Sequence, residues 1–395
     1  MNEEFDRKLL ESMIQLRREV HQYPELSRQE KETSKRIIRV LQSLGIDVQV
    51  FKDHYGVCGT VQGQGPGPVI ALRADMDALP ITEPKNKSYS SKVPGVMHAC
   101  GHDGHVAILL GVAELLVKNR QHFQGSVKLI FQPAEEAAPI GGSKLMIADG
   151  VLEHPKVDAI FGLHLWPSLP CGSIGIKPGP LMAGSDRFSI KLLGKSAHVG
   201  MPHKGLDAIM MAMEVIQSFN NMMTRQMNPL DIATLSIGKI TGGERYNIIA
   251  KEAFLEGTIR TFSSKVRQII PEHMKRIMAG VTEAHGGEYV FDYQPGYPIL
   301  NNWAGPTSLV AESACQVIDE KCVLKEIEPN LGGEDFARYL EKVPGALFWL
   351  GASKPGEEGA PLHNQDFEID ESALLIGAKI MFRTVCNALD FYKSK

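Results

Sequence analysis

Residues 69–77 read VIALRADMD, an apolar strand-like run that changes at once into an arginine and two aspartates. Other short apolar runs alternate along the chain with helical patterns. The runs lie at 127–131, 159–163 and 346–350, and the helical patterns at 106–117, 143–148 and 371–389. Nearly continuous apolar strands that alternate with helices are typical of a parallel sheet buried on both faces. The chain is therefore predicted to be an α/β protein with a mostly parallel sheet.

Ahead of the first run, residues 27–30 read SRQE. A serine followed three residues later by a glutamate is a capping box. Here it precedes an amphipathic pattern that includes Ile37 and Leu41 and stops at Gly45. The pattern predicts a helix that opens at Ser27.

The periodicity changes between residues 186 and 294, where strand patterns alternate between apolar and polar residues. The expected strands lie at 188–192, 233–240, 253–259 and 289–293, and the expected helices at 208–223 and 266–284. This order, β-α-β-β-α-β, is that of a ferredoxin-like unit, a four-stranded antiparallel sheet with two helices on one face.

Two Pro/Gly-rich segments, 178–180 and 295–298, flank this unit and predict hinges. The length of 395 residues also exceeds what a single hydrophobic core usually organises. We therefore predict two domains: a main domain formed by 1–183 and 297–395, and a smaller domain, 184–296, inserted between its two parts.

The composition excludes several classes of protein. Lys and Arg number 42 against 46 Asp and Glu, a net charge of -4 with no basic block, which argues against a nucleic-acid partner. Residues 1–6, MNEEFD, lack the apolar core of a signal peptide. The most apolar stretch, 106–117, is shorter than the roughly 20 residues that span a bilayer. We expect a cytoplasmic protein that does not enter a membrane.

Acidic, imidazole and thiol groups collect at the ends of the predicted strands. The strand at 127–131 runs into Glu135 and Glu136, the strand at 159–163 runs into His164, and Cys100 and His102 precede a helix. Ligands of parallel sheets bind beyond the carboxyl ends of the strands, so these groups predict a metal site with sulfur, nitrogen and oxygen ligands.

The two adjacent glutamates are expected to have different roles. Neighbouring side chains of an extended backbone point in opposite directions, so one glutamate can bind metal while the other acts as a general base. The chain contains no GxSxG and no HExxH motif. Serine-hydrolase and thermolysin-like mechanisms are therefore excluded.

Eight motifs in one order resemble those of a known family, the M20 metallopeptidases, and within it the amidohydrolase branch of N-acyl amino acid, hippurate and auxin-conjugate hydrolases. The motifs are LRADMDALP at 72–80, MHACGHD at 97–103, FQPAEE at 131–136, GLH at 162–164, SAH at 196–198, GTIR at 257–260, GGEDF at 332–336 and PLHN at 361–364. The resemblance covers nearly the whole chain.

The resemblance implies a zinc-peptidase-like catalytic domain with one or two divalent metal ions (Zn, Mn, Co or Ni). The implied metal ligands are Cys100, His102, Glu136, His164 and His363. It also implies that Glu135 is the catalytic base and that Asp77, which is not itself a ligand, orients one of the metal ligands. His363 is implied by the resemblance alone, because it lies in a loop that the strand ends do not indicate.

The inserted domain resembles the family's lid and dimerisation domain. The resemblance implies that His198 reaches the active site of a partner subunit and stabilises the oxyanion there. Asn247, Arg260 and Gly333 occupy substrate-binding positions, and an arginine is suited to a bidentate grip on a carboxylate. A homodimer is therefore expected, with a tetramer as a further state.

The activity implied is metal-dependent hydrolysis of N-acyl amino acids to a carboxylic acid and a free amino acid. An aminoacyl dipeptidase or carboxypeptidase on the same scaffold shares every motif and remains an alternative. A catalytically silent binder of acylated amino acids is a further alternative from another functional class.

Overall fold

The computed structural model describes residues 3–354 and 356–393, which divide into two compact units. The first unit comprises Met1–Leu181, Asn301–Glu328 and Asp335–Lys395, and the second comprises Met182–Leu300 and Pro329–Glu334. The short segment 329–334 differs from the sequence expectation, which assigned it to the main domain. It joins the second unit because the Ala183 amide donates hydrogen bonds to the carbonyls of Asn330 and Gly332.

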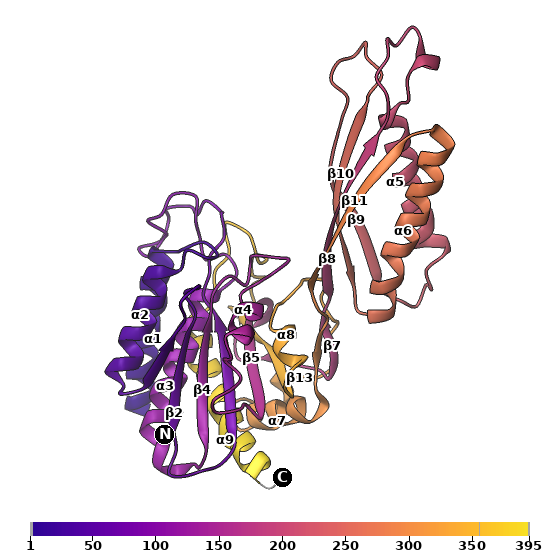
Figure 1. The fold of residues 1–395 in the computed structure, drawn as a ribbon. Helices are drawn as coiled ribbons and strands as arrows, with labels where there is room; N and C mark the ends of the chain where they lie inside the picture. Colours follow the sequence, from indigo (N-terminus) through magenta and orange to yellow (C-terminus); the bar gives the residue numbers. More distant parts are fainter. Residues whose placement is uncertain (1–2, 355, 394–395) are drawn as a thin grey trace. The chain divides into compact units, whose positions relative to one another are not determined.

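The first unit is built on an eight-stranded sheet in the order β1-β2-β4-β3-β5-β14-β6-β13 (Figure 1). The strands are β1 (Asp47–Val50), β2 (Val57–Gln62), β3 (Val69–Asp75), β4 (Ser126–Gln132), β5 (Ala159–Pro170), β6 (Ile174–Gly175), β13 (Val323–Leu324) and β14 (Gly345–Ser353). The four central strands, β4, β3, β5 and β14, are mutually parallel, and all residues of β3, β4 and β14 are buried. The predicted α/β class is confirmed, with an antiparallel edge at β1 and β2 that the sequence patterns missed.

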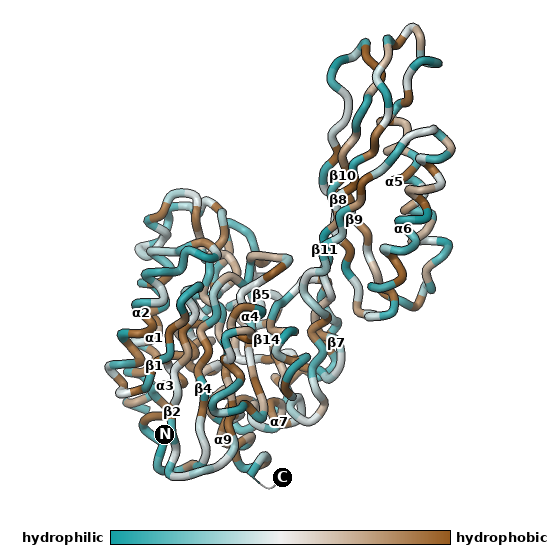
Figure 2. The backbone as a smooth tube through the Cα atoms, in the orientation of Figure 1, coloured by the Kyte–Doolittle hydropathy of each residue, from teal (hydrophilic) through white to brown (hydrophobic). Residues whose placement is uncertain are grey.

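Helices cover this sheet. They are α1 (Glu3–Gln22), α2 (Lys31–Ser43), α3 (His102–Asn119), α4 (Ser143–Ala148), α7 (Ala304–Ala314), α8 (Ala337–Leu340) and α9 (Ser372–Lys393). Both α3 and α9 pack against β3 and β5, and α1 packs on α3 and α9. Figure 2 shows hydrophobic residues gathered along the strands of the sheet. By length and composition α9 could cross a membrane, but 61% of its most apolar window is buried inside the protein, as in a core helix.

The helix predicted to open at Ser27 begins at Lys31 instead, so the capping-box prediction was wrong. The Ser27 hydroxyl donates to a carboxylate oxygen of Asp77 at 2.6 Å, which removes it from the helix terminus. The amides of Glu32 and Thr33 are capped instead by the Glu25 carboxylate, at 3.0 and 2.8 Å. A hydrogen bond to an ionised carboxylate is stronger than one between neutral groups, which favours the contact of Ser27 with Asp77.

The second unit has the predicted order β-α-β-β-α-β. Its elements are β8 (Gly184–Leu193), α5 (Ala208–Arg225), β9 (Ala233–Gly242), β10 (Glu252–Thr261), α6 (Ser264–His285) and β11 (Glu288–Tyr297). The strands form an antiparallel sheet in the order β11-β8-β10-β9. The Asp207 and Ser263 side chains cap α5 and α6. Where the chain passes between the units, β7 (Gly179–Met182) pairs with β12 (Leu300–Asn302).

Candidate metal centre

The predicted ligands lie around the carboxyl ends of β3 and β4 and the middle of β5. His164 lies on β5, and His102 is the first residue of α3, two residues after Cys100. Between them, Gly101 has a φ of 86°, and a Cβ at this position would lie 3.3 Å from the Leu165 side chain. Glycine thus allows the tight turn that directs both Cys100 and His102 toward β5.

The potential ligand atoms form two overlapping groups. In the first, those of Cys100, His102 and His164 lie within 4.8 Å of one another, with Cys100 Sγ 3.4 Å from His164 Nε2. In the second, those of Cys100, Glu136 and His363 do the same, with His363 Nε2 3.1 Å from Glu136 Oε1. The structure therefore brings all five predicted ligands together, and Cys100 belongs to both groups.

The loop that carries His363 is held against the Cys100 segment. The His363 amide donates to the carbonyl of Ala99 at 2.8 Å, and His363 has a left-handed φ of 61°. A left-handed conformation is costly for a histidine, so the hydrogen bond and packing must select it. No strand or helix pattern in the sequence predicts this loop contact.

Hydrogen bonds orient the two buried imidazoles. His102 Nδ1 lies 2.9 Å from the carbonyl oxygen of Asp77, and His164 Nδ1 lies 2.8 Å from the carbonyl oxygen of Leu165. A carbonyl only accepts, so both Nδ1 atoms carry a proton and both Nε2 atoms turn toward the cluster. His102 Nε2 is buried and has no hydrogen-bond partner within residues 3–354 and 356–393. An orphaned buried nitrogen is costly, and a metal ion would satisfy it.

The charges of the cluster also fit a cation. Burial raises the pKa of the Cys100 thiol well above its usual value, and the carboxylates of Glu136, Glu135 and Asp75 raise it further. Burial alone would lower the pKa of His102, but Asp75, Asp77 and Glu136 outweigh it and raise that pKa to about 10. The carboxylates around the cluster therefore favour positive charge at this place, which a divalent ion would supply.

Asp77 supports both the ligands and the glutamate pair. Its carboxylate accepts the amides of Glu135 and Glu136 at 3.1 and 2.9 Å and lies 3.3 Å from His102 Nδ1. Hydrogen bonding to His102 and Ser27 lowers the pKa of the Asp77 carboxyl despite its burial, so Asp77 is held as an anion. The predicted proximity of Asp77 to His102 is present in the structure.

Asp75 has different hydrogen-bond partners from Asp77. It accepts from Arg73 at 2.6 Å and faces His105 Nδ1 at 2.5 Å, while His105 Nε2 accepts the Leu165 amide at 2.8 Å. Leu165 is the residue whose carbonyl holds His164. The spacing of three residues between His102 and His105 on one helix is a usable sequence signal for this support.

Two tryptophans adjoin the cluster and were not predicted. The ring of His164 meets Trp166 edge-on with centroids 5.7 Å apart, and Trp166 stacks on Trp349 at 4.1 Å with an angle of 5° between the rings. His164 pairs with Trp349 across β5 and β14. The signal in the sequence is the spacing of two residues from His164 to Trp166, which places both side chains on one face of a strand.

The second unit contains the four remaining predicted site residues as two pairs; three belong to the predicted inserted domain, whereas Gly333 was predicted in the main domain. His198 forms a β-bridge with Ile248, and the Val199 amide donates to the Asn247 carbonyl at 3.4 Å. Arg260 donates to the Leu331 carbonyl at 2.7 Å, in the segment 329–334 that contains Gly333. His198 is exposed and Arg260 is half-buried.

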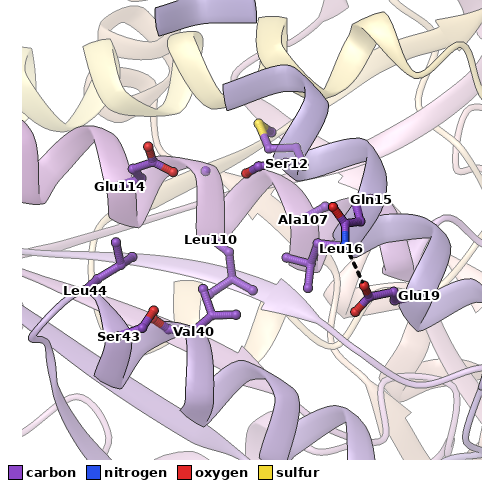
Figure 3. A pocket seen from close by; sticks show the side chains of 12 residues that line it. Ser12, Gln15, Leu16, Glu19, Val40, Ser43, Leu44, Ala107, Leu110 and Glu114 are labelled. Carbon is purple, nitrogen blue, oxygen red and sulfur yellow. Dashed lines mark hydrogen bonds between the residues drawn. The ribbon is translucent and has the colours of Figure 1, made fainter. Parts of the chain in front are cut away.

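A hollow of about 280 Å³ lies between α1, α2 and α3 (Figure 3). Leu16, Val40 and Leu110 line its apolar part, and Gln15 and Glu19 are hydrogen-bonded beside it at 3.1 Å. None of its lining residues is a histidine, a cysteine or a predicted site residue. The chemistry of this unit is therefore concentrated at the strand ends and not in this hollow.

The chain resembles several characterised proteins. It is 41% identical to the N-acetylcysteine deacetylase of Bacillus subtilis (93% of this chain, 94% of the relative) and 39% identical to the thermostable carboxypeptidase 1 of Saccharolobus solfataricus (94% of each). The crystal structure of the Bacillus subtilis YXEP protein, a dinuclear metal-binding peptidase from the M20 family, matches with a TM-score of 0.84 and 38% identity over 97% of this chain and 99% of that one.

These matches confirm the resemblance to the amidohydrolase branch of the M20 metallopeptidases. The sequence profile of Peptidase family M20/M25/M40 matches residues 71–387. The chain belongs to Peptidase family M20/M25/M40.

Proposed function

We propose that this protein hydrolyses the amide bond of N-acyl amino acids, such as acetyl or benzoyl derivatives, with one or two divalent metal ions held by Cys100, His102, Glu136, His164 and His363. The observation that carries the proposal is the cluster of these five donors, in which Cys100, His102 and His164 are buried, with Glu135 immediately beside it. Similarity to an N-acetylcysteine deacetylase supports this substrate class.

The proposed roles follow from the chemistry of each group. Bound divalent ions would lower the pKa of water and polarise a carbonyl. Glu135, which is 5% exposed, would accept a proton from the attacking water and return it to the departing amine. Asp77 would hold the Glu135 amide and thereby fix the direction of that carboxylate.

The second unit would contribute to binding. We assign Arg260 to the carboxylate of the substrate, because burial leaves its guanidinium poorly solvated and the Leu331 carbonyl uses only one of its N–H groups. Asn247 and Gly333 would bind the same substrate. His198 would stabilise the oxyanion in the site of a second copy of the chain.

A second copy is also the proposed occupant of an apolar face on α5. Ile209, Met210 and Met213 are 40, 45 and 56% exposed, and Ile240 on the edge strand β9 is 55% exposed. An exposed apolar face next to an open sheet edge is the kind of surface that a symmetric dimer covers. The proposed dimer would therefore form through the second unit.

The test is hydrolysis by the purified, metal-loaded protein. We expect Glu135→Gln to lower kcat by a factor of about 10² to 10⁴ at unchanged metal content, the usual contribution of a general base. Glu114→Gln on α3, outside the cluster, is the matched control and should retain parental activity. Equal kcat for Glu135→Gln and the parent would reject the assignment of the base.

The similarity to a carboxypeptidase motivates a second candidate activity. A panel of N-acetyl and N-benzoyl amino acids against dipeptides of the same amino acids separates the two. A higher kcat/KM on the dipeptides would replace our proposal by a peptidase. Absence of turnover together with failure to bind Zn, Mn, Co or Ni would favour a silent binder.

A further inference from the structure

Three successive backbone amides, those of the glutamate pair and of the residue before it, each donate a hydrogen bond to a buried carboxylate. The Ala134 amide donates to Glu30 Oε1 at 2.7 Å, while the Glu135 and Glu136 amides donate to the two oxygens of Asp77. Side chains from two separate parts of the chain thus clamp one short segment.

The clamped segment is in a conformation that needs support. Ala134 has a left-handed φ of 56°, which costs an alanine free energy that glycine would not lose. Its amide is the one that Glu30 accepts. The turn at Ala134 sets the direction in which the backbone enters Glu135, so its loss would move the Glu135 carboxylate.

Glu30 does not stabilise the start of the helix that it precedes. It precedes α2 but makes no side-chain cap there, since Glu25 caps the Glu32 and Thr33 amides. The Glu30 side chain is completely buried, and Oε2 has no hydrogen-bond partner among the described residues. A buried carboxyl with one unsatisfied oxygen costs stability, so a requirement other than stability explains it better.

We propose that Glu30 is a positioning residue for the general base: it holds the left-handed turn at Ala134 and thereby aims the Glu135 carboxylate at the attacking water. The proposal rests on the proposed function of Glu135. It concerns a residue outside the matched family region 71–387, in the segment that joins α1 to α2. The adjoining Ser27, which donates to Asp77, ties the same segment to the other half of the clamp.

The test uses three variants of the metal-loaded protein with an N-acyl amino acid substrate. Glu30→Gln keeps an oxygen acceptor for the Ala134 amide, Glu30→Asp withdraws the acceptor by one methylene, and Glu30→Met removes it at similar side-chain volume. We expect kcat within about threefold of the parent for Gln and a loss of about 10- to 100-fold for Met, with Asp between them, because small displacements of a catalytic group cost this much. KM and metal content should change by less than about twofold in all three.

Glu25→Ala is the matched control, because it removes the actual cap of α2. It should lower the thermal unfolding temperature while kcat stays at the parental value. If Glu30→Met does not fold, the comparison of Gln with Asp carries the test. The inference would be overturned if Glu30→Asp or Glu30→Met kept the parental kcat. It would also be overturned if Glu30→Met and Glu25→Ala lost kcat and unfolding temperature to the same extent. An inactive parent would instead reject the proposed function.

Discussion

At the scale of single residues, one carboxylate connects most of the candidate site. Asp77 accepts the Ser27 hydroxyl and two backbone amides and lies beside His102 Nδ1. It touches none of the reacting atoms in the proposed mechanism. Its influence would act through the metal ligand and the glutamate pair that it orients, as outer carboxylates commonly do around metal sites.

The first prediction concerns Asp77. Replacing it by Asn exchanges one acceptor oxygen for an NH₂ group that faces a backbone amide, so the segment around Glu135 and the His102 ring should shift. We expect a loss of metal affinity of about 10- to 100-fold, measured by competition with a chromophoric chelator. Ser27→Ala, which removes only one donor to Asp77, should lower affinity far less. Parental affinity in Asp77→Asn would show that the ligand set is oriented without it.

The second prediction concerns Glu30 and pH. Burial, and then repulsion from the Asp77 carboxylate, raise the pKa of Glu30 from 4.5 to about 7. The folded protein therefore holds this proton more tightly than the unfolded chain does, so the contribution of Glu30 to stability falls as pH rises from about 4.5 to about 7.

Glu30→Gln cannot lose a proton and should escape this penalty. Relative to the parent, its free energy of unfolding should rise by about 2 to 3 kcal/mol between pH 5 and pH 8, since one pKa unit corresponds to about 1.4 kcal/mol. Urea unfolding of both proteins at the two pH values measures the difference. A constant difference across pH would mean that the Glu30 pKa is not raised.

At the scale of elements, a buried ion cluster ties α1 to the start of α3 and to the start of α9. Arg17 Nε donates to Asp103 at 2.8 Å and Arg17 Nη1 donates to Glu371 at 3.0 Å, while His21 Nδ1 faces the same oxygen of Asp103 at 2.8 Å. Burial opposes ionisation of Asp103, but Arg17 and His21 outweigh it and hold its pKa far below the usual range. Because Asp103 follows His102 directly, this cluster anchors the end of α3 that faces the candidate metal centre.

The third prediction follows from the burial of this cluster. Arg17→Met leaves Asp103 and Glu371 without their shared cation, and removing one partner of a buried ion pair typically costs about 3 to 5 kcal/mol. Arg7→Met is the matched control on the same helix. The side chains of Arg7 and Glu11, which form an ion pair, are 65% and 61% exposed, so this pair should contribute less than about 1 kcal/mol to stability. Thermal unfolding of both variants compares them, and equal destabilisation would contradict the prediction.

The elements also show where sequence reasoning ends. The four central strands were predictable because each buries a continuous apolar run, whereas the edge strands β1 and β2 were missed. The cluster of Cys100, His102, His164 and the glutamates followed from the predicted strand ends. His363 was reached only through family resemblance, because its position depends on a loop hydrogen bond. The start of α2 was misplaced because a distant carboxylate, Asp77, binds Ser27, and no local pattern encodes that contact.

At the scale of the whole molecule, the fourth prediction concerns assembly. Met213→Glu places a charge on the exposed apolar face of α5, where burial against a second copy would desolvate it. We expect the proposed dimer to dissociate, with a mass near 43.4 kDa in light scattering and a loss of kcat, because His198 would no longer reach a second site. Val50→Glu, at a residue of the first unit that is 60% exposed, is the control. An intact dimer in Met213→Glu would contradict this interface.

The stacked tryptophan pair beside His164 has an optical consequence. The chain contains three tryptophans, and Trp166 and Trp349 are the two in that stack, while the third, Trp303, is half exposed at the start of α7. In a Trp303→Phe background all indole fluorescence would come from the pair. Since the pair contacts His164, titration with a quenching ion such as Co²⁺ would report occupancy of the cluster as a loss of emission, so the protein carries its own reporter for metal binding, independent of any substrate.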